Sequence, residues 1–293
     1  MDDTQMITKN NNLAETDEIA DLLSSLPKEK SWRTGYVYRY QGFWCPEKQL
    51  ADLLSSLPKE KSWRSGYVYR YQGFWCPEKQ VPAVIAFQKH FLAQKTDTII
   101  VTMPKSGTTW LKALAFSIMN RAKYTPSSSP LNSVNPHDLV PFCDLGPLSL
   151  EDCFDGFCNG LGGFGPFFDH VLGYWRESLK RPDEVLFLAF EDMKEDIHSQ
   201  MKRLAEFLGC PFSLEEEADG VIEGISKMCS LSNLKDKEIN KTGRFHPYFE
   251  NKTLFRKGEV GDWVNYLTPE MVDRMNKIME QKLAGSGLKF KTG

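Results

Sequence analysis

Residues Thr98 to Phe116 read TIIVTMPKSGTTWLKALAF, an apolar run that ends in a Pro-Lys-Ser-Gly turn and continues into helix-forming residues. The run over Thr98–Met103 predicts a buried strand, and the segment from about Thr108 to Met119 predicts a helix. The first N–H groups of a helix have no internal acceptor and carry partial positive charge. A strand, a small-residue turn and a helix in this order are therefore typical of a phosphate-binding loop.

The residue types in the turn suit an anion. Gly107 lets the backbone approach a ligand closely, Lys105 adds a positive charge, and Ser106, Thr108 and Thr109 add hydroxyl donors. The order differs from the GxxxxGK[ST] loop of ATP- and GTP-binding proteins, because the lysine here precedes the glycine. The pattern therefore predicts no Mg²⁺ site of that kind. For this loop alone, a turn without a ligand is an equally good interpretation.

A second basic element stands near the C-terminus, where Leu254–Trp263 read LFRKGEVGDW. Arg256 and Lys257 lie beside Gly258, and neighbouring basic side chains next to a glycine suit a phosphate group. A solvated basic turn is the alternative for this motif taken alone. The presence of both elements in one chain favours a ligand that carries phosphates at two ends.

The composition of the chain excludes several classes of protein function. The chain has 293 residues, a formal net charge of −3, a pI of about 6.0 and 41% hydrophobic residues, which is typical of a soluble globular protein and not of a nucleic-acid binder. No secretory signal and no membrane-spanning run are evident. The seven cysteines show no zinc-binding spacing, so we expect free thiols and no metal. These features predict a cytoplasmic protein without nucleic-acid or membrane partners.

A near-perfect repeat occupies the N-terminal part. Ala20–Gln49 and Ala51–Gln80 are identical except that Ser65 replaces Thr34. Each copy predicts a short helix and a strand pair, around Tyr36–Trp44 or Tyr67–Trp75. The second copy continues into a helical pattern, so we expect it to belong to the fold and the first copy to be surplus, with no obvious partner. Two copies are too few for a solenoid, which indicates a recent tandem duplication or an error in assembling the sequence.

Strands and helices alternate along the rest of the chain. The compact apolar run over Glu184–Met193 predicts a second buried strand. The predicted class is α/β, with a P-loop-like parallel sheet flanked by helices. Besides the helix after the loop, helices are predicted at Ser149–Asn159, Gly165–Lys180, Ile197–Leu208, Ser213–Ser226 and Pro269–Leu283.

The paired motifs PKSGTTW and FRKGxxGDW resemble those of the cytosolic sulfotransferases, and NPHDLVPF and GFGPFFDHVLGYWRESLKRP are similar to the plant branch. The resemblance runs from about Ala51 to the C-terminus. It implies transfer of a sulfuryl group from 3′-phosphoadenosine 5′-phosphosulfate (PAPS) to a hydroxyl of a small molecule, without a metal. Flavonoids, hydroxyjasmonates and steroid-like compounds are the acceptors that the family suggests.

The resemblance also implies roles for particular residues. The PKSGTTW loop would hold the 5′-phosphosulfate, its tryptophan would contact the adenine, and the basic turn would hold the 3′-phosphate. Lys105 would stabilise the charge that develops on the leaving group. Phe190 and Leu231 stand where the family usually has Tyr and Phe. The residues implied for nucleotide binding are Lys105, Ser106, Gly107, Thr108, Thr109, Trp110, Phe190, Arg256, Lys257 and Gly258.

The main departure from the family lies at Val140–Phe154, VPFCDLGPLSLEDCF. In the family several dozen residues stand within this stretch. They carry the histidine that acts as general base and an apolar strand that leads to an arginine and a serine for the 3′-phosphate. We therefore expect a sulfotransferase domain over residues 51–293 that is internally truncated near 145–148, after a tail and surplus copy over residues 1–50. An interior strand of the sheet would be missing, and we expect marginal stability and aggregation.

None of the five histidines is placed by the sequence to replace the missing base. By the resemblance, His137, His170 and His246 fall where the family has substrate-side or lid segments, whereas His90 and His198 lie on predicted helices. A surface or satisfied structural role is expected for each. We therefore expect impaired sulfuryl transfer. The alternatives are a non-catalytic nucleotide-binding remnant or interaction protein and, with less support, a P-loop kinase. Candidates for the acceptor pocket, which suit a core role equally well, are Phe142, Phe164, Phe167 and Phe168.

Overall fold

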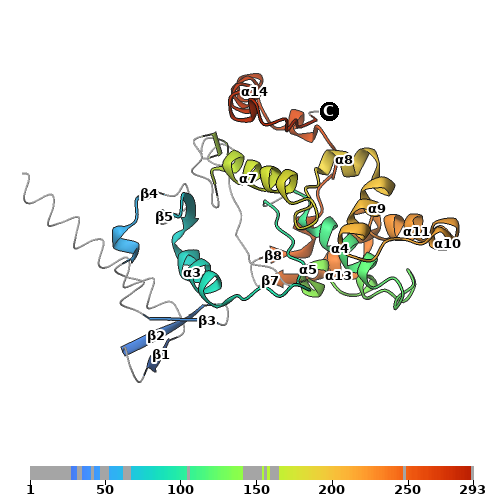
Figure 1. Cartoon of the computed structure of the whole chain (residues 1–293), viewed down its shortest axis with the longest axis horizontal. Helices are drawn as coiled ribbons and strands as arrows, with labels where there is room; N and C mark the ends of the chain where they lie inside the picture. The colour runs from blue at the N-terminus through green and yellow to red at the C-terminus, as the bar shows by residue number, and fades with distance from the viewer. Residues whose placement is uncertain are drawn as a thin grey trace, which may run out of the picture. The chain divides into compact units, whose positions relative to one another are not determined.

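The computed structural model describes residues 28–31, 35–40, 43–46, 53–61, 67–103, 106–140, 154, 157–158, 165–246 and 249–291. The chain forms two compact units (Figure 1), each of which is described by itself. The first comprises Met1–Asp97 and Leu148–His170, and the second comprises Thr98–Pro147 and Val171–Gly293. Lys105 and the predicted junction at 145–148 lie outside the described residues.

The first unit contains the same three-stranded antiparallel sheet twice. The strand pair predicted for each copy is confirmed, and a third strand precedes each pair. The register repeats with the sequence, since Lys28 lies opposite Tyr38 in one sheet and Lys59 lies opposite Tyr69 in the other. The strands are β1 (Lys28–Ser31), β2 (Gly35–Tyr40), β3 (Phe43–Pro46), β4 (Lys59–Lys61), β5 (Tyr67–Tyr71) and β6 (Phe74–Pro77).

The second copy runs on through η1 (Glu78–Gln80) into helix α3 (Val81–His90), as predicted. A small core of fully buried side chains forms here, with Leu54, Tyr69 and Val81 at 2% exposure or less. Helix α3 also lies beside β3 of the first copy. This contact gives the first copy a neighbour, and a small sheet gains stability from packing against a helix. That the first copy is surplus to the fold stays a prediction.

The second unit has a helical core. Helices α4 (Thr108–Met119), α9 (Ile197–Phe207) and α11 (Val221–Met228) lie side by side (Figure 1) and bury a common apolar cluster. The predicted helices after the loop and over Ile197–Leu208 are thus confirmed. Two further predictions are confirmed by α7 (Phe167–Lys180), which starts in the first unit, and α14 (Pro269–Leu283). The fully buried side chains of the core include Leu114, Ile118, Met201 and Leu234.

Other predicted helices differ from the structure. The single helix predicted over Ser213–Ser226 is two helices, because Gly220 adopts a left-handed φ of 71° and begins a new helix. The helix predicted at Ser149–Asn159 lies largely outside the described residues, although 154 and 157–158 are helical. The remaining elements are η2 (Pro130–Asn132), α5 (Pro136–Leu139), α8 (Phe190–Glu195), α10 (Leu214–Ala218), α12 (Leu231–Asp236), α13 (Glu238–Thr242), β7 (Arg244–His246), β8 (Phe249–Glu250), η3 (Asn251–Leu254) and η4 (Asp262–Asn265).

The chain is mixed α/β, but the predicted parallel sheet is absent from the described residues, whose strands form only antiparallel sheets. Residues 98–103 and 185–189 are not strands, and the run predicted as a strand over Glu184–Met193 turns into helix α8 at Phe190. The composition of these runs suits a strand, yet a strand also needs a neighbour to satisfy its peptide groups. Among the described residues no strand pairs with residues 98–103, and Ile99 is 55% exposed and Val101 43% exposed.

Candidate functional site

The phosphate loop, residues 106–110, forms an open helix start. Gly107 has a φ of 97° and stands at the N-cap of α4. The first bond within the helix runs from the Leu111 N–H to the Gly107 carbonyl, at 2.9 Å. The Ser106 backbone N–H, by contrast, donates to the Met103 carbonyl at 3.2 Å. The N–H groups between these two bonds have no acceptor within the helix, which is the arrangement that accepts an anion.

Helix α8 covers one side of this loop. A Cβ added to Gly107 would lie 3.3 Å from Cδ2 of Phe190, so glycine is needed for space as well as for its φ. The Trp110 ring meets the Phe190 ring edge-on, with centroids 5.7 Å apart. The Lys194 ammonium stands 5.9 Å from the centroid of the Trp110 ring. The structure thus brings together Gly107, Trp110 and Phe190, which the sequence implied from separate segments.

In the basic turn, residues 256–258, both basic side chains form ion pairs with the same carboxylate. Arg256 Nη1 and Lys257 Nζ each lie 3.0 Å from a carboxylate oxygen of Asp262, whose side chain is only 2% exposed. The hydrogen bond from Lys257 is the main cause that lowers the pKa of the Asp262 carboxyl below its usual value. Gly258 has a φ of 64°, and a Cβ on it would lie 2.9 Å from Cδ2 of Leu231. The turn therefore packs directly against the start of α12.

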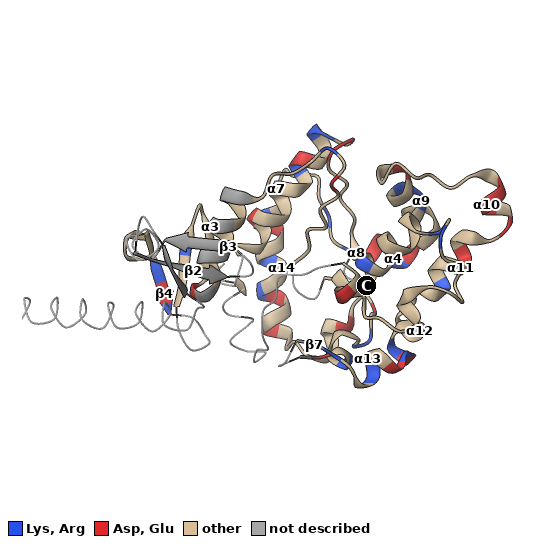
Figure 2. Ribbon diagram, turned by 90° about the horizontal axis from the view of Figure 1, so that it is seen from below, with Lys and Arg blue, Asp and Glu red and all other residues tan. Residues whose placement is uncertain are grey.

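A pocket of about 340 Å³ lies beside helix α8. It is lined by Glu191, Lys194 and Glu195 of α8, by Val260 from the segment after the basic turn, and by Lys291. Lys291 pairs with Asp192 at 2.8 Å and also with Glu195, which holds the C-terminal segment beside α8 (Figures 1 and 2). Helix α8 thus lies against the phosphate loop through Phe190 and borders a pocket that is also lined by Val260, two residues after the basic turn.

Sequence reasoning missed a polar cluster beneath the loop. Thr109 Oγ1 lies 2.9 Å from Nε2 of His137, and Lys112 Nζ lies 3.2 Å from its Nδ1. Lys112 also donates to the Val140 carbonyl at 2.8 Å. The side chains of Lys112 and His137 are both buried. The sequence shows that Thr109 and Lys112 share one helix face. It does not show their common partner His137, which lies 28 residues after Thr109 and 25 after Lys112.

The described histidine side chains all have neighbours. His137 has both ring nitrogens in contact with Thr109 and Lys112, which agrees with the satisfied structural role expected for it. His170, in the first unit, packs edge-on against Phe74, and burial lowers its pKa. His198 pairs with Glu223 at 2.7 Å on the surface. The side chains of His90 and His246 lie outside the described residues.

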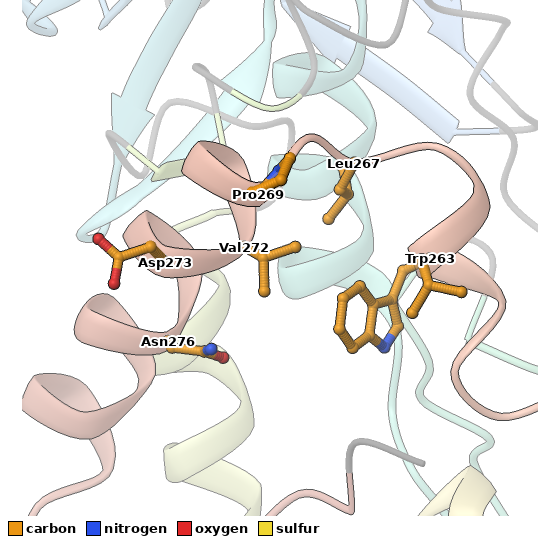
Figure 3. Close-up of a pocket in the computed structure, with 7 residues that line it drawn as sticks. Trp263, Leu267, Pro269, Val272, Asp273 and Asn276 are labelled. Carbon is orange, nitrogen blue, oxygen red and sulfur yellow. The ribbon is translucent and has the colours of Figure 1, made fainter.

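Other features lie apart from these contacts. A shallow pocket of about 460 Å³ lies between η4 and α14, with Trp263, Val272 and Asn276 on its walls (Figure 3). None of the implied nucleotide residues lines it.

Of the candidates for the acceptor pocket, Phe167 and Phe168 pack on one another in the first unit, whereas Phe142 and Phe164 lie outside the described residues. In the part of the chain that the structure describes, no cluster of metal-binding side chains is present and no helix is long and apolar enough to cross a membrane.

Comparison with known proteins identifies the class. A family model described as "Sulfotransferase domain" matches residues 95–147 and 146–287. The chain therefore belongs to the sulfotransferase family, whose members use PAPS as co-substrate for sulfuryl transfer. Within that family it is 42% identical to cytosolic sulfotransferase 15 of Arabidopsis thaliana, over 94% of this chain and 87% of the relative.

Solved structures agree with this assignment. The chain superposes with a TM-score of 0.62 on an Arabidopsis thaliana "putative steroid sulphotransferase", which is 32% identical, over 82% of this chain and 94% of that one. It shares its fold with mouse sulfotransferase SULT7A1, crystallised with the nucleotide PAP, at a TM-score of 0.52 and 21% identity, over 75% of this chain and 95% of that one.

Proposed function

We propose that the phosphate loop and the basic turn hold the two ends of PAPS, and that the chain is a cytosolic sulfotransferase for a small hydroxylated acceptor. The observation that carries this proposal is the position of α8. It contacts Gly107 through Phe190 and Trp110 through Lys194, and it shares a pocket with Val260 beyond the basic turn. An open helix start and a basic turn, each of which suits an anion, fit a nucleotide with phosphates at both ends.

The roles proposed for single residues follow from that arrangement. Thr109 and the open N–H groups at the start of α4 would donate hydrogen bonds to the 5′-phosphosulfate. Ser106 and Thr108 would do so after a change of partner, because the Ser106 hydroxyl donates to the Met103 carbonyl and the Thr108 hydroxyl is hydrogen-bonded to Thr102. Lys105 would stabilise the bridging oxygen as the sulfur–oxygen bond breaks. Arg256 and Lys257 would bind the 3′-phosphate once they release the carboxylate of Asp262.

For the acceptor, we propose a flavonoid, hydroxyjasmonate or steroid-like hydroxyl compound. The solved relative with a steroid sulphotransferase description supports the steroid-like class. The names of the curated relatives support a cytosolic location for this chain.

We further propose that the domain over residues 51–293 is truncated near 145–148 and therefore transfers sulfuryl groups poorly. The two parts of the family match meet at residues 146–147, and the alignment with cytosolic sulfotransferase 15 extends over 344 positions, more than the 293 residues of this chain. The exposure of Ile99 and Val101 supports a missing neighbouring strand. The loss of a general base should lower the rate by about 10²- to 10⁴-fold.

Two measurements on the full chain test these proposals. Calorimetric titration with PAP, the desulfated nucleotide, should show binding at one site, and absence of binding would contradict the nucleotide site. Transfer of labelled sulfate from PAPS to a panel of acceptors should be detectable but slow. Nucleotide binding without any transfer would instead support the alternative of a non-catalytic nucleotide-binding protein.

An insertion tests the truncation directly. The segment of cytosolic sulfotransferase 15 that this chain lacks would be placed between Gly146 and Pro147, with a scrambled segment of equal length as control. We expect turnover to rise about 10²- to 10⁴-fold and the amides of residues 98–103 and 185–189 to become protected from hydrogen exchange. Unchanged exchange in both segments would contradict the missing strand.

A further inference from the structure

In the cluster of Lys112, His137 and Thr109, chemistry decides which group donates and which accepts each hydrogen bond. A lysine ammonium can only donate hydrogen bonds. Lys112 Nζ lies 3.2 Å from Nδ1 of His137, so that ring nitrogen must be the acceptor. A proton on Nδ1 would set two donors against each other, and a doubly protonated ring would add a second positive charge in a buried site.

The proton of a neutral His137 ring must then sit on Nε2. Because Nε2 lies 2.9 Å from Thr109 Oγ1, its N–H donates to the threonine oxygen. The hydroxyl proton of Thr109 cannot also point at the ring. Within the described residues, the bond to His137 is the one hydrogen bond recorded for the Thr109 hydroxyl, so its proton is available to a ligand at the loop.

The rest of the structure holds His137 in this position. The His137 backbone N–H donates to Asn135 Oδ1 at 2.8 Å, which caps the short helix α5. The Asn135 amide donates in turn to Asn240 Oδ1 at 2.8 Å, and the Asn240 amide donates to the Leu234 carbonyl at 2.8 Å. Both asparagines are fully buried, at 0% and 1% exposure. The ring is therefore anchored from α12 and α13, far along the chain from the loop.

We propose that His137 is a positioning residue for the phosphate loop: Lys112 fixes its tautomer, and the tautomer turns the Thr109 hydroxyl into a dedicated donor to the phosphosulfate end of the nucleotide. The second half of this statement rests on the proposed function, whereas the tautomer does not. A hydroxyl that is already oriented binds an anion without first giving up another hydrogen bond.

The tautomer can be measured on the full chain labelled with ¹⁵N-histidine. The His137 signals are assigned by their loss in His137→Gln. Long-range ¹H–¹⁵N correlations at neutral pH should show a neutral ring protonated on Nε2. In Lys112→Met, which removes the ammonium but keeps the apolar stem, the proton should redistribute between the two nitrogens. Lys123→Met, an exposed substitution at the turn after α4, is the matched control and should leave the signals unchanged.

A ring protonated on Nδ1 or on both nitrogens would overturn the proposal, as would an unaltered signal in Lys112→Met. PAP titration tests the consequence. Thr109→Ser keeps the hydroxyl and should bind PAP within about threefold of the unmodified chain, whereas Thr109→Val should bind about 10- to 100-fold more weakly. Equal affinity of Thr109→Val and the unmodified chain would overturn the role in binding. If the unmodified chain does not bind PAP, the proposed function fails, and the tautomer still decides whether Lys112 sets the orientation of Thr109.

Discussion

The phosphate loop and the basic turn both present positive potential, but they do so in different ways. The loop relies on backbone N–H groups and hydroxyls at the start of α4, held in place by Gly107 and by the buried His137. The turn relies on two formal charges, and both already contact Asp262. The backbone of the loop therefore already has the shape that would accept an anion, whereas the turn would have to exchange Asp262 for the proposed phosphate. Anion affinity at the loop should depend mainly on backbone shape, and anion affinity at the turn should depend on salt and pH.

The largest effect should come from Gly107→Val. A β-branched residue is strained at a φ of 97°, and its Cβ would press on Phe190 at 3.3 Å. We expect PAP binding to fall by about 100-fold or more, measured by calorimetry, because the N–H groups of the helix start would move. Gly285→Val is the matched control, since Gly285 has a φ of 71° but nothing within 4 Å of its added Cβ. Similar affinity losses in both variants would show general backbone strain and no specific role of the loop.

A smaller loss is expected from the double substitution Arg256→Met and Lys257→Met. Each charged hydrogen bond to phosphate contributes about 1.5–3 kcal/mol, less at exposed positions such as these. We expect PAP affinity to fall about 10- to 100-fold and its dependence on ionic strength to flatten. The corresponding double substitution at Arg181 and Lys180, exposed on another face, should change neither quantity. A salt dependence equal to that of the unmodified chain would contradict the proposed phosphate contact.

Asp262→Asn should raise the affinity for PAP. Removing the carboxylate leaves Arg256 and Lys257 unpaired, so PAP should bind about tenfold more tightly at low salt, with the gain lost at high salt. Fluorescence titration at two ionic strengths would measure this difference. Weaker binding at both would mean that Asp262 positions the basic side chains and does not compete with the ligand.

Acid should also affect the turn through Asp262. Its pKa is lowered by the hydrogen bond from Lys257, so the stability contributed by this carboxylate is present above its unfolded pKa. That contribution is lost as the pH falls through the lower pKa of the folded chain. Between about pH 5 and pH 2, the urea midpoint of the unmodified chain should fall more steeply than that of Asp262→Asn. Parallel curves for the two chains would contradict a stabilising role of the ionised carboxylate.

The smallest effect should come from Leu231→Phe, which places an aromatic ring beside the basic turn. An aromatic ring can stack on a purine and adds about 0.5–1.5 kcal/mol, so PAP affinity should rise about two- to tenfold. Gly258 lies against Leu231, so the larger ring has to find room beside the basic turn. Leu267→Phe, at the other pocket beside α14, should leave PAP affinity unchanged. A loss of affinity in Leu231→Phe would show that the ring displaces the turn.

Sequence reasoning succeeded where the signal is local. Helices α4 and α14 have the predicted bounds because apolar spacing and end residues such as Gly107 and Thr268 act within a few residues. It failed for residues 98–103 and 185–189, because an apolar run becomes a strand only when another segment supplies its hydrogen bonds.

The candidate site shows the same limit. Gly107, Trp110 and the basic turn were marked by motifs, and the structure brings the first two against Phe190. The contacts of Asp262 with Arg256 and Lys257, and those of His137 with Thr109 and Lys112, could not be predicted. They depend on how distant segments meet, which no spacing within one motif records.

The duplicated meander has a consequence for how the chain folds. β1 and β4 share the sequence Lys-Glu-Lys, so β4 can pair with β2 as well as with β5 in the same register. The exchanged pairing closes a longer loop, but each doubling of loop length costs only about 0.6 kcal/mol. Because α3 is synthesised after both copies, we expect a nascent chain to sample both pairings before that helix forms. The ratio of correct to exchanged molecules is then set by the rate of synthesis as much as by stability.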